Sequence, residues 1–135
     1  MVLQQLNKCD MKKIQSEVRK FMEERDWLSQ QPADVAKSIV IESAEVLEKF
    51  QWVNPSVKEV KEDKDLYRKV GMELADVIIF CAEMAIILDY DVHKLVSEKL
   101  EKQAEKYPVE KVKGHNGHHN YLAIKQEYRR KGKNE

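Results

Sequence analysis

The stretch VGMELADVIIFCAEMAIIL, residues 70–88, decides the fold class. It is apolar almost all round a helix, and the exceptions are Glu73, Asp76 and Glu83. A helix with apolar residues on every side usually lies in the middle of a core or in a subunit interface. Because Glu83 interrupts the apolar run, the run is too short to span a bilayer. The stretch therefore predicts a buried helix over residues 66–88.

The segments around it show the spacing of amphipathic helices. Apolar residues recur every three or four positions over residues 10–27, 32–52 and 92–106. Pro32 suits the first turn of the second of these helices, and Asn54-Pro55 ends it. We expect the apolar residues of the last helix to face inward; these are Leu95, Val96 and Leu100. The charged residues 56–65 predict a loop or a solvated helical turn.

The composition supports an all-α protein. Of the 135 residues, 42% are hydrophobic and 36% are charged, and four Gly and three Pro interrupt the chain. High charge with few helix breakers favours long helices over a sheet. We expect one domain over residues 1–114, followed over 115–135 by a basic tail that adds at most a short helix. Three neighbours in one chain cannot cover a helix as apolar as residues 78–88, which favours a homodimer or homotetramer.

Charge and cysteine content exclude several classes of function. The chain has 24 basic and 24 acidic residues, so a general affinity for nucleic-acid polymers is not expected. Its two cysteines, Cys9 and Cys81, form no CxxC motif, which argues against a disulfide scaffold and a cysteine-based zinc site. We expect Cys81 to be a core residue. The polar first residues are not those of a signal peptide, which predicts a cytoplasmic protein without membrane association.

Four carboxylates stand on apolar helix faces. Glu42 and Glu45 are three residues apart in one helix, and Glu73 and Asp76 repeat that spacing in the next. Residues at i and i+3 share a helix face, so each pair points in one direction. If the pairs face each other, a cation must neutralise them. Oxygen ligands without a nearby His or Cys suit Mg²⁺ or Mn²⁺ rather than Zn²⁺.

These acids allow two other interpretations. The first is that they form ordinary salt bridges with nearby basic residues, namely Lys37, Lys49, Arg68 or Lys69. The second is a di-iron bundle, but such bundles use Glu-x-x-His pairs, and no acid here stands three residues before a His. The interpretation that remains beside salt bridges is a helical bundle whose carboxylates bind a metal without histidine ligands.

The ordered set of motifs resembles the MazG-like all-α nucleoside triphosphate pyrophosphohydrolases, and within them the dCTP-pyrophosphatase-like branch. The signature of that superfamily is ExxE on one helix and ExxD on the next, here Glu42-Ser-Ala-Glu45 and Glu73-Leu-Ala-Asp76. Three more stretches resemble the ends of family helices: residues 24–27 (ERDW), 48–52 (EKFQW) and 106–109 (KYPV). The likeness covers roughly residues 11–114.

The resemblance implies a four-helix bundle completed by oligomerisation, with a Mg²⁺-dependent reaction. A nucleoside triphosphate would be cleaved between its α and β phosphates, giving the monophosphate and pyrophosphate. Glu42, Glu45, Glu73 and Asp76 would hold Mg²⁺, for which Mn²⁺ could substitute, and Glu45 would also act as the general base. The resemblance also implies a set of substrate-binding residues: Phe21, Trp27, Trp52, Lys99, Gln103 and Tyr107.

The chain departs from the family pattern where the nucleobase would be read. The loop at residues 29–34 is one residue shorter than in many relatives, and Gln103 and Phe80 replace the usual Asn and Tyr. The reaction class is therefore better defined than the substrate. Two other functions remain open: a non-catalytic helical interaction or regulatory module, and a hydrolase of another phosphate anhydride, such as a phosphoribosyl nucleotide.

Overall fold

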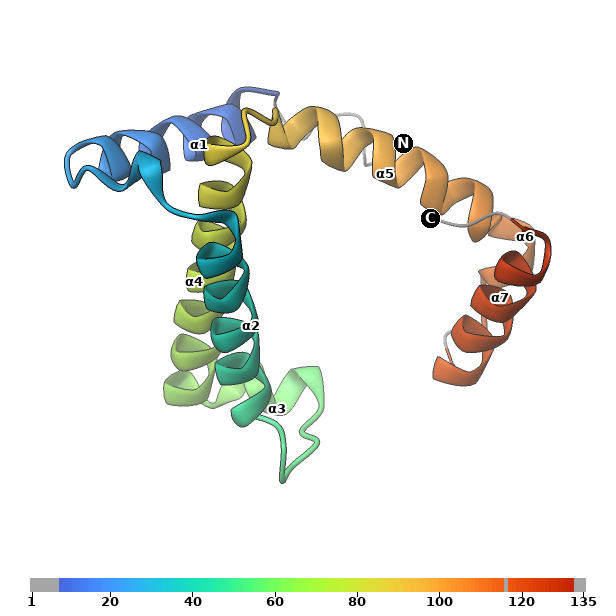
Figure 1. Ribbon diagram of the computed structural model, residues 1–135. Coiled ribbons are helices and arrows are strands. Elements are labelled where there is room, and N and C mark those ends of the chain that lie inside the picture. The colour runs from blue at the N-terminus through green and yellow to red at the C-terminus, as the bar shows by residue number, and fades with distance from the viewer. Residues whose placement is uncertain (1–7, 116, 133–135) are drawn as a thin grey trace. The chain divides into compact units, whose positions relative to one another are not determined.

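The computed structural model describes residues 8–115 and 117–132, and within them it contains helices and no strands. This confirms the all-α prediction. The chain forms two compact units, of which the first ends at Val92 and the second begins at His93 (Figure 1). The predicted domain boundary near residue 114 is not tested by this division. Among the described residues, no helix combines the length and apolar character that a membrane crossing requires.

The first unit is built on two long antiparallel helices, α2 (Pro32–Glu48) and α4 (Lys64–Ile87), which lie side by side (Figure 1). Helix α1 (Lys8–Glu23) packs against the C-terminal part of α4, and the short helix α3 (Val57–Glu62) lies near its N-terminus. A 3-10 turn, η2 (Trp27–Ser29), connects α1 to α2. This arrangement brings the ExxE helix next to the ExxD helix.

The core of this unit is small and lies between α1 and α4. Val18 and Met22 of α1 pack against Ala82 and Ile86 of α4, and Met22 is fully buried. Burying such side chains supplies the main stabilisation, at about 25 cal/mol per Å² of apolar surface. The α1 helix is therefore attached to the C-terminal end of α4, about two turns beyond the acidic pair.

Helix α4 is less buried in the single chain than its sequence predicts. Ala82, Glu83, Ala85 and Ile86 are buried, but Ile78 remains 46% exposed. The expectation that Cys81 is a core residue is wrong, because its side chain is exposed. The reason is that α1 and α2 cover part of the helix and leave a further apolar face open.

Local geometry shifts two predicted helix ends and gives the charged segment its structure. Helix α1 ends at Glu23 instead of reaching residue 27, because Asp26 adopts a left-handed conformation with φ 57°. Helix α2 ends at Glu48 instead of residue 52, and turns follow. The charged segment forms the helical turn α3, which a capping box starts: the Ser56 Oγ accepts from the Glu59 N–H, and the Glu59 carboxylate accepts from the Ser56 N–H.

The described residues of the second unit form the helices α5 (Val92–Lys106, whose first residue ends the first unit), α6 (Val109–Val112) and α7 (His118–Arg130). Helix α7, with 13 residues, is longer than the short helix expected in the tail. The Tyr107 and Tyr121 rings stack with centroids 5.5 Å apart, which attaches α7 to the end of α5. Within this unit Leu95, Val96 and Leu100 are exposed, and the expectation that they face inward remains a prediction.

Candidate metal centre

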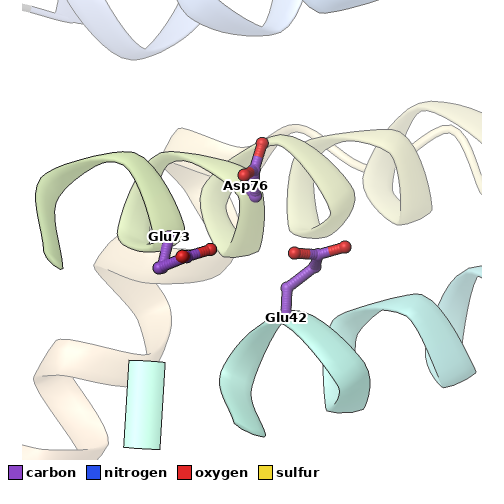
Figure 2. Close-up of side chains that lie close together, drawn as sticks. All are labelled: Glu42, Glu73 and Asp76. Carbon is purple, nitrogen blue, oxygen red and sulfur yellow. The ribbon is translucent and has the colours of Figure 1, made fainter. Parts of the chain in front are cut away.

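Three of the four predicted carboxylates converge between α2 and α4. Glu42 extends from α2 toward α4, which carries Glu73 and Asp76 (Figure 2). One oxygen of each carboxylate lies within 4.8 Å of one oxygen of each of the others. All three side chains are half-buried. The i, i+3 spacing on α4 turns its pair toward one face, and the antiparallel packing places Glu42 opposite.

The fourth carboxylate lies beside this group instead of within it. A hydrogen bond joins the Glu45 side chain to Glu73. The negative charge of Glu42 is the largest cause that raises the pKa of Glu45, and the hydrogen bond to Glu73 adds to it. Mutual repulsion of the acids thus favours a proton at Glu45. The prediction that Glu45 is itself a metal ligand remains a prediction.

A lysine neutralises part of the charge. The Lys49 Nζ lies 2.8 Å from the Glu73 Oε1, and both side chains are about one-fifth exposed. Hydrogen bonding to Lys49 lowers the pKa of Glu73, and the reciprocal contact raises the pKa of Lys49. The salt-bridge interpretation therefore holds for Glu73. The other lysines pair elsewhere, with Lys37 at 2.9 Å from Asp34 and Lys69 at 2.6 Å from Asp65.

The donor set fits a hard divalent cation. Three carboxylates with one ammonium group leave net negative charge in a half-buried position. Mg²⁺ is bound in proteins by a few carboxylates while it keeps several waters, which phosphate oxygens can replace. Glu42, Glu73 and Asp76 can therefore hold such an ion and leave coordination positions for a phosphate chain.

Two of the predicted substrate residues lie together at the start of the first unit. The Phe21 and Trp27 rings pack edge to face with centroids 5.7 Å apart. The Arg25 guanidinium lies 3.7 Å from the Phe21 ring centroid, and its Nη1 donates to the Phe21 carbonyl at 2.9 Å. Both rings are more than 40% exposed, so they present an aromatic surface to solvent. Base stacking needs a surface of this kind.

The other four predicted substrate residues belong to other segments of the chain. Trp52 follows α2 and is 87% exposed. Lys99 and Gln103 belong to α5, and Tyr107 follows it, so all three are in the second unit. Their roles remain predictions.

Sequence reasoning missed two residues near the aromatic pair. Glu83 is only 2% exposed, and its Oε2 accepts a hydrogen bond from the Gln30 Nε2 at 3.3 Å. The signal in the sequence is that Glu83 is an acidic residue within an apolar run. Its partner was not predictable, because Gln30 is 53 residues away in an irregular segment.

Comparison with known proteins identifies the family. Residues 37–121 match the MazG-like family, and this range includes all four acids. The chain belongs to the MazG-like family. It is 30% identical over 111 residues to dCTP pyrophosphatase 1 of Rattus norvegicus and to that of Mus musculus. The match covers 78% of this chain and 61% of each of these relatives.

A solved structure supports the same assignment. The crystal structure of a pyrophosphatase from Archaeoglobus fulgidus matches with a TM-score of 0.63 and 34% sequence identity. The match covers 73% of this chain and 92% of the archaeal one. Both the sequence identity and the shared fold agree with membership in the MazG-like family.

Proposed function

We propose that this chain is a nucleoside triphosphate pyrophosphohydrolase that requires Mg²⁺ and accepts Mn²⁺ in its place. The bond between the α and β phosphates would be hydrolysed, giving a nucleoside monophosphate and pyrophosphate. The observation that carries the proposal is the convergence of Glu42, Glu73 and Asp76 between α2 and α4. The pyrophosphatase relatives support the reaction class.

The chain's own residues would divide the work. Glu42, Glu73 and Asp76 hold the cation, which when bound neutralises phosphate charge and acidifies water. Glu45, which lies against Glu73 and outside the three-carboxylate group, would accept the proton of the attacking water when its carboxylate is ionised. No covalent nucleophile is needed in this scheme. The nucleobase would stack on Phe21 and Trp27. A contribution of Trp52, which follows the C-terminal end of α2, stays a prediction.

The active form would be a homodimer or homotetramer. Exposed apolar residues on both long helices support this, since a contiguous apolar surface is usually covered; they include Met72, Leu74 and Ile78 of α4 and Val40, Ile41 and Leu47 of α2. Lys99, Gln103 and Tyr107 stay predicted substrate-binding residues of this proposed function. We further propose a cytoplasmic role in removing unwanted nucleotides from the pool.

Pyrophosphate release tests the proposal directly. The protein is incubated with canonical and modified NTPs and dNTPs, with and without Mg²⁺, and light scattering gives its mass in solution. We expect metal-dependent release from one or a few of the nucleotides. A folded protein that releases nothing from the whole panel would overturn the proposal. A phosphoribosyl nucleotide is assayed beside the panel, and release from it alone would show that the substrate is a different anhydride. No response to metal would favour a non-catalytic module.

A further inference from the structure

The buried carboxylate of Glu83 is unusual in its position on α4. It is 2% exposed and lies between the core residues Ala82 and Ile86 in sequence. Moving a carboxyl group out of water is costly unless polar contacts replace the lost hydration, and an apolar residue of similar size avoids that cost. The acid at this position therefore calls for an explanation beyond packing.

The contact that the structure gives this carboxylate is with a loop. The Gln30 Nε2 donates to the Glu83 Oε2 at 3.3 Å across 53 residues of sequence. Gln30 stands directly after η2 and two residues before the Pro32 that begins α2. The hydrogen bond therefore attaches the irregular segment between α1 and α2 to the side of α4.

This segment carries Trp27. On one side of it the left-handed Asp26 turns the chain so that the Trp27 ring meets Phe21, and Arg25 lies over the Phe21 ring. On the other side the segment is held at Gln30. The aromatic pair is thus fixed from both ends although it is exposed, and an exposed ring without such restraint would be mobile.

The position of Glu83 on α4 relates this anchor to the acids. Glu83 comes seven residues after Asp76, so it lies on the same helix face, about two turns or 10 Å along the axis. The loop bearing Trp27 is therefore held at a set distance from the three-carboxylate group.

We propose that Glu83 is a positioning residue which, through Gln30, fixes the loop of Trp27 for stacking on the nucleobase while the carboxylate group holds the phosphates. Glu83 itself does not touch the substrate. This inference rests on the proposed function for its kinetic consequences. The anchoring of Trp27 can be measured without turnover.

Steady-state kinetics of two variants test the kinetic part. Glu83→Met keeps the size of the side chain but removes the acceptor, whereas Glu83→Gln keeps an oxygen that accepts from Gln30. For Glu83→Met we expect KM for the nucleotide to rise about tenfold, the equivalent of one lost hydrogen bond, with kcat little changed. Glu83→Gln is expected to restore KM to within about twofold. An unchanged KM in Glu83→Met would contradict the proposal.

Two controls separate positioning from general stability. Ile86→Val loosens the same core without touching Gln30, and we expect its KM to equal that of the wild type. The double variant Gln30→Met, Glu83→Met is expected to be no worse than either single one, because both remove the same bond. If Ile86→Val raises KM as much as Glu83→Met does, the role of Glu83 is merely structural.

Tryptophan fluorescence provides a measurement that needs no activity. In a Trp52→Phe background Trp27 is the remaining tryptophan, and acrylamide quenching reports its mobility and exposure. We expect Glu83→Met to increase the quenching constant and Glu83→Gln to leave it near the starting value. If the wild type shows no turnover, the proposed function fails, and quenching alone decides the anchoring. Equal quenching in all three proteins would overturn it.

Discussion

Helix α4 carries carboxylates in two contrasting settings. Near its N-terminal half, Glu73 and Asp76 are half-buried and lie within 4.8 Å of a third acid, Glu42. Near its C-terminal end, Glu83 is fully buried and has an uncharged amide as its partner. The first setting concentrates like charge, which an isolated chain has no structural reason to do. The second setting holds one acid away from other charges. It needs no cation, and a single neutral hydrogen-bond donor contacts it.

The comparison indicates that the two ends of α4 have different tasks. A bound cation would relieve the repulsion among Glu42, Glu73 and Asp76, and this relief favours metal binding. The end of α4 that carries Glu83 is attached to α1 and to the segment after η2, so it fixes the position of that segment. Substitutions at the two ends should therefore have different effects. At the acidic group we expect loss of activity without loss of stability, and at Glu83 we expect a change in substrate affinity.

The largest effect is expected from neutralising one acid of the cluster. Asp76→Asn removes a metal ligand of the proposed site, and we expect kcat/KM to fall by about a thousandfold or more, since metal catalysis is worth several kcal/mol. The fold should persist, and circular dichroism checks this. Glu48→Gln removes the same charge from α2 outside the group and is expected to change turnover less than about twofold. Loss of folding in Asp76→Asn would mean that the acids are structural.

Metal should stabilise the wild type strongly. At a Mg²⁺ concentration a hundredfold above its Kd, binding to the folded state alone adds about 2.7 kcal/mol, which thermal unfolding detects as a higher Tm. Asp76→Asn should lose this increase and should have a higher Tm than the wild type in EDTA, because repulsion with Glu42 and Glu73 is relieved. Equal Mg²⁺ shifts in both proteins would place the ion elsewhere.

The convergence of the acids was easier to predict from the sequence than their surroundings, because the relevant distances are local. The i, i+3 spacing of Glu73 and Asp76 fixes a helix face whatever the chain does elsewhere. By contrast, Gln30 meets Glu83 through a loop whose path depends on the left-handed Asp26, and no helix period encodes that path. Exposure was also misjudged, as Cys81 shows, since it depends on how much of α4 the neighbours cover.

In the fold as well, local features were easier to predict than long-range ones. The four main helices were predicted from apolar periodicity, which acts over one to two turns. Their ends were displaced at Glu23 and Glu48, where tight turns rather than periodicity end the helix. The length of α7 was underestimated because its polar sequence has a weak apolar period, and the stacking of Tyr121 on Tyr107 supplies its attachment.

A smaller effect is expected on stability at the other end of α4. Burial raises the pKa of Glu83, so its contribution to folding is most favourable below the ordinary glutamate pKa and is lost as the pH rises through the folded value. Glu83→Met should therefore be more stable than the wild type at neutral pH by about 1–2 kcal/mol. The gain should shrink toward pH 4, where urea titrations compare the two proteins. A gain independent of pH would show that the carboxylate charge is not its source.

The smallest effect concerns Lys49, which competes with a cation for Glu73. Its ammonium group lies 2.8 Å from the Glu73 carboxylate and holds the pKa of that acid below its usual range. Removing this charge in Lys49→Met leaves the carboxylate free for metal, so we expect Mg²⁺ affinity to rise about two- to fivefold, the range of a partly exposed ion pair. Calorimetric titration measures the change, and Lys37→Met, which removes an exposed lysine on the same helix, is the matched control. The direction follows from the sign of the charge, because an ammonium group next to a cation site repels the ion. Weaker Mg²⁺ binding in Lys49→Met would instead mean that the lysine orders Glu73 for the ion, and the two settings of α4 would then be more alike than their burial indicates.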